Sequence, residues 1–160
     1  MNELPFYLAA FLVVLGVLIV FHELGHYTVA RLCGVKVLRF SVGFGKVLWQ
    51  KRLGPDQTEW AVSIFPLGGY VKMLDEREGE VTEGERHRAF NRQPVGKRSL
   101  IVAAGPAANF LLAILLYWGI FMHGSDELLP ILGTPPDGTP AAMASIGNGE
   151  QVRTLDGQPV

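Results

Sequence analysis

A charged, metal-binding motif closes a long apolar run near the N-terminus of this chain. Residues 6–21 contain no charged side chain, and His22-Glu-Leu-Gly-His26 follows directly. Ionisable groups inside a membrane-length helix are costly, so their presence there indicates a function. A helix brings His22 and His26 onto one face, one turn apart, which is the geometry in which two imidazoles share a zinc ion. Glu23 lies about 100° round the helix, where it can act on a water molecule rather than ligate the metal.

Two segments of the sequence are apolar over a length that crosses a membrane. The first extends from about residue 4 to residue 30, and the second from about residue 100 to residue 122, where Gly105-Pro106 interrupts it. At 1.5 Å per residue, either helix covers about 30 Å of hydrocarbon. The first segment lacks the basic start and the small-residue cleavage site of a signal peptide. The sequence therefore predicts an α-helical polytopic membrane protein with two spans in this chain.

The basic residues are distributed very unevenly. Thirteen of the fourteen lie between Arg31 and Arg98, and only Arg153 follows them. By the positive-inside rule, residues 31–99 are cytoplasmic, whereas the N-terminus and residues 123–160 lie in the periplasm of a bacterium. We therefore expect a multi-pass protein of the bacterial inner membrane, surrounded by the lipid bilayer. No block of basic residues interleaved with aromatic ones supports binding to nucleic acid.

Counting residues from these basic flanks gives the depth of the polar groups in the spans. His22 and His26 precede Arg31 by nine and five residues, about 8–14 Å from the cytoplasmic end of their helix. Asn109 follows Arg98 by eleven residues, about 16 Å from the same side. At this similar depth, Asn109 either makes a helix–helix hydrogen bond or faces the metal site and holds substrate backbone.

The cytoplasmic loop has the pattern of a small sheet. Residues 35–74 alternate apolar and polar side chains, are rich in β-branched and aromatic residues, and are divided by turn-forming residues. This pattern predicts three or four short strands. The sheet either dips toward the membrane, where an exposed edge could pair with an extended peptide, or is a cytoplasmic element without a substrate role.

The last part of the chain has a different composition. From Pro130 onward it contains five Pro and five Gly and shows little helical periodicity. It is typical of the start of a β-rich soluble domain, although about thirty residues cannot close a core of their own.

Taken together, these motifs closely resemble those of the site-2 protease family of intramembrane zinc metalloproteases. The resemblance covers nearly the whole chain and rests on residues 21–26 (Phe-His-Glu-Leu-Gly-His), 39–45 (Arg-Phe-Ser-Val-Gly-Phe-Gly), 66–76 (Pro-Leu-Gly-Gly-Tyr-Val-Lys-Met-Leu-Asp-Glu) and 104–110 (Ala-Gly-Pro-Ala-Ala-Asn-Phe). The tail resembles the opening of the family's periplasmic PDZ domain at residues 138–142 and 149–152, and residues 155–157 (Leu-Asp-Gly) stand where that domain has a hairpin turn.

The resemblance implies an architecture. Residues 1–122 would form the N-terminal half of an intramembrane metalloprotease core, with a cytoplasmic, membrane-associated β-hairpin loop at about residues 35–74. Residues 123–160 would begin an incomplete, periplasmic PDZ-like β domain.

The resemblance also implies a site and a substrate class. His22 and His26 would ligate Zn²⁺, and Glu23 would be the general base and acid. Substrates would be transmembrane segments of single-pass proteins already trimmed on the outside, notably anti-sigma factors and signal-peptide remnants. The residues that would position substrate are Phe44, Gly68, Gly69 and Asn109.

One element of the family's site is expected to lie outside this chain. The family takes its third zinc ligand from an Asp in a Leu-Asp-Gly motif on a later membrane helix. Leu155-Asp156-Gly157 has those letters, but it lies in a polar tail on the periplasmic side, so we do not expect Asp156 to bind the metal. Apart from Glu23, which the resemblance makes the general base, no carboxylate within the spans stands at the depth of the histidines.

Three functions therefore remain open on the sequence alone. The first is a zinc-dependent intramembrane endopeptidase, of which the chain as given would be a truncated and inactive part. The second is a membrane-anchored metallopeptidase acting on soluble substrates, which is disfavoured because residues 6–21 run directly into His22. The third is a truncated, non-catalytic membrane adaptor that lacks the third zinc ligand. The sequence predicts no oligomeric state.

Overall fold

The computed structural model describes residues 3–124, 131–144 and 146–159 of the chain. Contacts within it divide the chain into two units, Met1–Trp118 and Gly119–Val160, which are described separately. Part of the expected PDZ-like segment, residues 125–130, 145 and 160, lies outside the described residues. The main elements of the first unit are α1 (Leu4–Leu32), β1 (Val37–Leu53), β2 (Thr58–Met73), the 3₁₀ turns η1 (Glu83–Arg88) and η2 (Phe90–Arg92), and α2 (Val95–His123).

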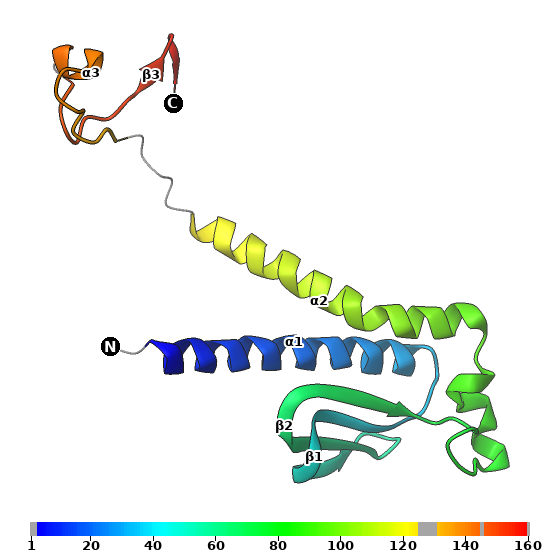
Figure 1. Cartoon of the computed structure of the whole chain (residues 1–160). Helices are drawn as coiled ribbons and strands as arrows, with labels where there is room; N and C mark the ends of the chain where they lie inside the picture. Colours follow the sequence, from blue (N-terminus) through cyan, green and yellow to red (C-terminus); the bar gives the residue numbers. More distant parts are fainter. Residues whose placement is uncertain (1–2, 125–130, 145, 160) are drawn as a thin grey trace. The chain divides into compact units, whose positions relative to one another are not determined.

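Among the described residues, two helices are long and apolar enough to cross a membrane, and they are α1 and α2. Each has 29 residues. Helix α2 begins at Val95, five residues before the predicted start at residue 100. Helix α2 continues through Gly105-Pro106 and changes direction along its length (Figure 1). Pro106 accounts for such a bend because it has no N–H for the carbonyl four residues earlier, and its ring crowds that carbonyl.

The loop between the helices forms one small sheet from two long, bent strands. Strands β1 and β2 pair antiparallel where residues 47–53 meet residues 58–63 and where residues 37–42 meet residues 69–73, whereas residues 39–42 run in step with residues 59–62. Val62 has Val42 on one side and Trp49 on the other, while residues 39–42 pair both with residues 59–62 and with residues 69–72. The loop was predicted to contain three or four short strands, and the structure instead has two long strands whose bends divide them into four segments. Their order across the sheet is 47–53, 58–65, 37–44 and 69–73.

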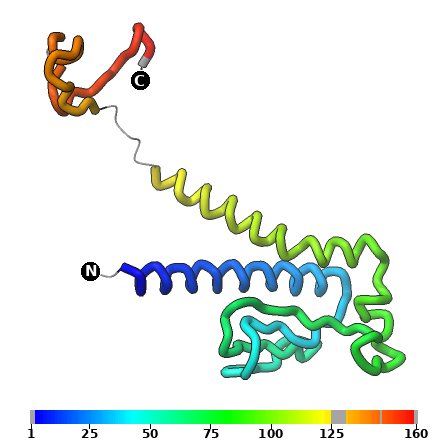
Figure 2. Tube along the Cα trace, viewed as in Figure 1, coloured from blue at the N-terminus to red at the C-terminus, as the bar shows by residue number. Residues whose placement is uncertain are grey.

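The bend of β1 depends on glycine. Gly43 and Gly45 have φ angles of 89° and 85°, a region that other residues rarely adopt. A Cβ at Gly43 would also stand 2.8 Å from the carbonyl oxygen of Ser63. The sheet formed in this way packs against α1, and Figure 2 shows its trace beside the C-terminal half of that helix.

A small apolar core fastens the sheet to both helices. Ala30, Val35, Val37 and Ile101 are almost completely buried in it. Tyr27 packs against this core and contacts the rings of Phe40 and Trp60, with centroid separations of 5.8 and 5.1 Å. The core therefore joins the end of α1 to the start of α2 within one turn of His26.

An ion cluster stabilises the side of this unit that the sequence predicts to be cytoplasmic. Asp56, in the turn between β1 and β2, accepts hydrogen bonds from both terminal nitrogens of Arg88 in η1, each at 2.7 Å. Arg31 at the end of α1 contacts the same carboxylate at 2.9 Å. Bonds from Arg88, followed by the charges of Arg31 and Lys36, hold the pKa of Asp56 below its usual range.

The second unit contains three short elements, α3 (Pro140–Met143), β3 (Thr154–Leu155) and β4 (Gln158–Pro159). Strands β3 and β4 form an antiparallel hairpin. Asp156 and Gly157 at its turn both have positive φ, 51° and 80°, as a two-residue hairpin turn of type I′ requires. The predicted hairpin turn at Leu155-Asp156-Gly157 is confirmed, whereas the PDZ-like domain stays a prediction.

Candidate active site

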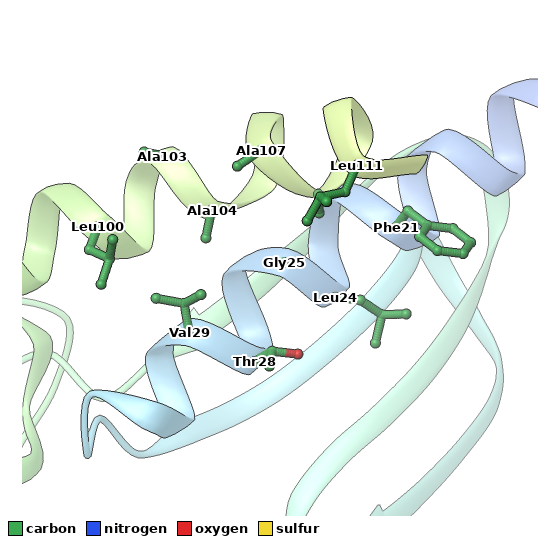
Figure 3. Close-up of a pocket in the computed structure, with 11 residues that line it drawn as sticks. Phe21, Leu24, Gly25, Thr28, Val29, Leu100, Ala103, Ala104, Ala107 and Leu111 are labelled. Atoms are coloured by element: carbon green, nitrogen blue, oxygen red, sulfur yellow. The ribbon is translucent and has the colours of Figure 1, made fainter. Parts of the chain in front are cut away.

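Helices α1 and α2 approach closely because the residues between them are small. A Cβ at Gly25 would stand 2.8 Å from Cβ of Ala108 and 2.9 Å from the carbonyl carbon of Ala104. In Figure 3, Gly25 lies on α1 below Ala104, whose side chain points toward α1. Small residues permit this kind of backbone approach between membrane helices. The glycine of the His-Glu-Leu-Gly-His motif thus brings its two histidines against α2.

The two histidines converge through their Nε2 atoms. These atoms lie 3.2 Å apart, and the two rings meet edge to face with a centroid separation of 4.8 Å. The Nδ1 atom of His26 lies 2.7 Å from the carbonyl oxygen of Ile101 in α2. Gly105 of α2 faces both rings, since a Cβ there would stand 2.7 Å from Nε2 of His22 and still closer to Nε2 of His26.

This pair of nitrogens fits a zinc ion. Two ligands at about 2.0–2.1 Å from a tetrahedral zinc stand about 3.3 Å apart, close to the separation of the two Nε2 atoms. Zinc takes three or four protein ligands, so two histidines alone are insufficient. Within residues 3–124, 131–144 and 146–159, no group of three His, Cys, Asp or Glu side chains is placed to hold a metal.

Glu23 is enclosed between α1 and the sheet. Its residue is 8% exposed, although a charged side chain normally remains in solvent. The close neighbour is Gly69 of β2, where a Cβ would stand 2.8 Å from Cγ of Glu23 and 2.8 Å from the carbonyl oxygen of Ser41. The sheet can therefore reach Glu23 only because residue 69 has no side chain.

A cavity of about 420 Å³ lies between α1, the bends of the sheet and α2. Phe44, one of its lining residues, stacks on the ring of Tyr70, with centroids 6.2 Å apart and planes 12° from parallel. Six of the seven predicted site residues line this cavity, and His26 contacts it through His22. The six are His22, Glu23, Phe44, Gly68, Gly69 and Asn109.

Asn109 has the position that its predicted depth requires. Its side-chain Nδ2 lies 3.5 Å from Nδ1 of His22, while its Oδ1 is buried without a hydrogen-bond partner. Residue counting predicted a similar depth for His22 and Asn109, and their side chains do meet in the structure, while the depth in a membrane stays a prediction. Of the two roles left open for Asn109, the contact with His22 favours the one that faces the metal site.

A second cavity, of about 440 Å³, lies in the interface between the two helices and differs in chemistry (Figure 3). Its walls are apolar or small residues, and Thr28 supplies the one side-chain hydroxyl among them. No residue of this wall can ligate a metal or transfer a proton at neutral pH. Of these two cavities, the one at Glu23 carries the groups that can ligate a metal or transfer a proton.

Sequence reasoning missed two parts of the site. One is Gly105, whose relevant signal was its spacing of four residues from Asn109, the same spacing as that between His22 and His26. The other is the carbonyl oxygen of Ile101, and a backbone acceptor leaves no mark in a sequence.

Comparison with known proteins gives the relationship of the chain. Residues 10–155 match Peptidase family M50. The chain is 51% identical over 152 residues to the regulator of sigma-E protease RseP of Escherichia coli K12. The matched region covers 94% of this chain and 33% of that protein. The chain is 50% identical over 150 residues to the protease RseP of Yersinia pestis, again with 94% and 33% covered. A protein of Ralstonia nicotianae named as a zinc metalloprotease is 58% identical over 144 residues, with 86% and 31% covered.

A pair of histidines whose Nε2 atoms converge and a buried glutamate lie on a membrane-length helix, in a chain this similar to proteins named as proteases. The chain belongs to peptidase family M50, the site-2 proteases. It spans about one third of the length of the curated relatives that it matches. The resemblance indicated by its motifs is thereby confirmed.

Proposed function

We propose that this chain is the N-terminal half of the catalytic core of a zinc-dependent intramembrane endopeptidase. Its substrates would be transmembrane segments of single-pass proteins in a bacterial inner membrane, such as anti-sigma factors or signal-peptide remnants. The observation that carries the proposal is the convergence of His22 and His26, whose Nε2 atoms lie 3.2 Å apart, beside a cavity lined by Glu23.

In this mechanism the chain supplies two metal ligands and the proton carrier. Zinc, when bound, polarises the scissile carbonyl and lowers the pKa of water toward neutrality. His22 and His26 would hold the metal through their Nε2 atoms. Glu23 accepts the proton that the attacking water loses and delivers it to the leaving nitrogen as the peptide bond breaks. A carboxylate is required because a neutral amide in its place cannot accept that proton.

The sheet would hold the substrate in an extended form. A peptide bond inside a helix is shielded by its own turns, so the substrate segment must unwind before hydrolysis. Residues 69–73 pair with β1 on one side only, which leaves backbone groups of this edge segment available to an added strand. Because Gly69 adjoins Glu23, a peptide paired along this edge would pass next to the carboxylate. Phe44, Gly68 and Asn109 line the same cavity and would contact the substrate.

The remaining parts of the site and the topology follow from the sequence predictions. We expect the third zinc ligand from an Asp outside these residues. We also expect residues 31–99 in the cytoplasm, with the N-terminus and residues 123–160 in the periplasm. Water would then reach the site from the cytoplasm, the side to which His26 is nearer.

The proposal is tested with the full-length protein in liposomes. The substrate is a single-pass anti-sigma factor from which the periplasmic domain has been removed. Replacing the general base, Glu23→Gln, should reduce cleavage by about 10²–10⁴-fold with zinc still bound. Glu78→Gln, at a side chain that is 60% exposed and paired with Lys72 at 3.7 Å, is the matched control and should retain activity.

Two results would contradict the proposal. Cleavage at the wild-type rate by the Glu23→Gln protein would exclude Glu23 as the proton carrier. Stable binding of the anti-sigma factor without cleavage, by both the wild type and the variant, would instead identify the non-catalytic adaptor.

A further inference from the structure

Helix α2 places polar groups beside the two histidines at a helical spacing that matches theirs. Ile101, Gly105 and Asn109 are four residues apart and share one face of α2, as His22 and His26 share one face of α1. The helices run in opposite directions, so His26 meets Ile101 and His22 meets Asn109, at 2.7 and 3.5 Å from their Nδ1 atoms. Gly105 lies between the two contacts and leaves room for both rings.

The contact of His26 determines which of its nitrogens carries the proton. A backbone carbonyl only accepts hydrogen bonds, so the 2.7 Å contact with Ile101 requires Nδ1–H to donate. A neutral imidazole has one N–H, and Nε2 is therefore left with its lone pair free. This is the tautomer in which His26 binds a metal through Nε2.

The contact of His22 gives the same result once the amide of Asn109 is considered. Rotation of the amide by half a turn exchanges Oδ1 and Nδ2 with little change in shape, so hydrogen bonding decides between the two orientations. As placed, Nδ2 faces Nδ1 of His22, and Oδ1 is buried without a partner. The Nε2 atoms of both histidines converge, so a His22 that binds a metal through Nε2 carries its proton on Nδ1, and only Oδ1 of the amide can accept from that N–H. With Oδ1 toward His22, the oxygen accepts from Nδ1–H, and Nε2 of His22 is free.

We propose that Asn109 is a positioning residue for the metal. By accepting a hydrogen bond from Nδ1–H of His22 it fixes the tautomer and ring orientation that present Nε2 to zinc, as the Ile101 carbonyl does for His26. This inference rests on the proposed function, because it assumes that the histidines bind zinc. It gives Asn109 a role distinct from contact with substrate, and the two are separable by experiment.

The test measures zinc binding rather than activity. Full-length protein in detergent is titrated with Zn²⁺ against a competing chelator, for the wild type, Asn109→Leu and Asn109→Asp. Leucine has a similar size but no acceptor, and loss of such a partner typically lowers metal affinity by about 10–100-fold. Aspartate keeps an acceptor toward Nδ1–H, so its affinity should remain within a few-fold of the wild type. Asn91→Leu is the control, since it removes an amide that bonds Glu76 far from the cavity, and its zinc affinity should not change.

A second measurement needs no substitution at Asn109. Nitrogen-15 chemical shifts of the labelled His22 ring in zinc-free protein, assigned with a His22→Asn protein, should show the proton on Nδ1. A proton on Nε2 would overturn the inference even if Asn109→Leu fails to fold.

The outcomes separate the two proposals. Equal zinc affinity of the wild type and Asn109→Leu would overturn the role of Asn109 and leave the protease proposal intact. A wild-type protein that binds no zinc would overturn both. A loss in Asn109→Leu that Asn109→Asp does not share would support the inference, because a purely structural role in folding would not follow the presence of an acceptor.

Discussion

Gly105 of α2 lies directly against His26 of α1, and a Cβ at Gly105 would stand 2.7 Å from Cε1 of the imidazole. Real Cβ atoms essentially never come so close to another heavy atom. The face of α1 that carries both histidines is thus in contact with bare backbone of α2. The absence of a side chain at Gly105 permits α1 and α2 to approach closely at the two histidines.

Adding a methyl group at this contact should therefore impair the metal site. Gly105→Ala should cost about 1–3 kcal/mol by overpacking, which corresponds to roughly a 5- to 150-fold loss of zinc affinity if the strain falls on the histidines. Zinc titration of the full-length protein measures the effect. Gly119→Ala, in the same helix with nothing within 4 Å of the added Cβ, should bind zinc as the wild type does. If both alanine variants bind equally well, Gly105 does not define the site.

A methyl group at Gly69 should act on Glu23 instead. It would press on Cγ of Glu23 and on the carbonyl oxygen of Ser41, and a backbone atom cannot rotate away. We expect kcat/KM of Gly69→Ala to fall by about tenfold or more, with zinc content unchanged, because an overpacked contact costs about 1–3 kcal/mol. Gly79→Ala has no neighbour within 4 Å and serves as the control. Unchanged kcat/KM in Gly69→Ala would mean that the sheet does not need to approach Glu23.

The contact between Gly68 and Phe44 allows a double-mutant cycle. A Cβ at Gly68 would stand 3.0 Å from Cζ of Phe44, and closer still to Cε2 of that ring. Gly68→Ala should displace the ring from the cavity edge and raise KM for a membrane substrate. Phe44→Leu removes most of the clash, so the combined variant should be less impaired than the sum of the two single variants. Strictly additive effects on KM would show that the two positions do not act on each other.

The ion cluster around Asp56 predicts a pH dependence. The pKa of Asp56 is held below its usual range by Arg88 and then by Arg31, so this carboxylate contributes stability that is fully present above its unfolded pKa of about 3.9. That contribution is lost as the pH falls through the folded pKa. Asp56→Asn should lower the free energy of unfolding of the loop by about 1–3 kcal/mol at pH 7, and the difference from the wild type should shrink below about pH 4.

Hydrogen exchange of residues 37–73 at pH 7 and at low pH measures this effect. Glu83→Gln is the control, because the Glu83 side chain is 92% exposed and its contact with Arg86 is 3.5 Å long. A constant difference between Asp56→Asn and the wild type at both pH values would show that the charge of Asp56 is not what stabilises the turn.

The sequence predicted the two helices and the proximity of His22 and Asn109 well, because both depend on local properties. A long apolar run determines a helix, and a rise of 1.5 Å per residue determines depth, so the proximity of His22 and Asn109 could be expected from counting alone. The strands of the loop were also identified by their alternation. In contrast, the order of the four segments in the sheet depends on pairing between residues far apart, and alternation carries no information about partners.

The close contacts made at glycine residues were the part of the site that the sequence did not predict. Gly25, Gly69 and Gly105 each permit a close approach to a particular neighbour, yet in the sequence they look the same as Gly16 or Gly119, which have none. The substrate-binding roles of Phe44, Gly68 and Gly69 stay predictions, as does the membrane orientation.

The wide separation in sequence of the contacts at the histidines has a consequence for biosynthesis. His26 and Ile101 are 75 residues apart, and His22 and Asn109 are 87 residues apart. A ribosome adds about 5–20 residues per second, so several seconds pass between synthesis of the motif and synthesis of its α2 neighbours. During that interval the nascent chain holds a glutamate and two imidazoles in its first span without the backbone that orients them. Under the proposed function, His22 and His26 are therefore oriented for a metal only after the second span has been made.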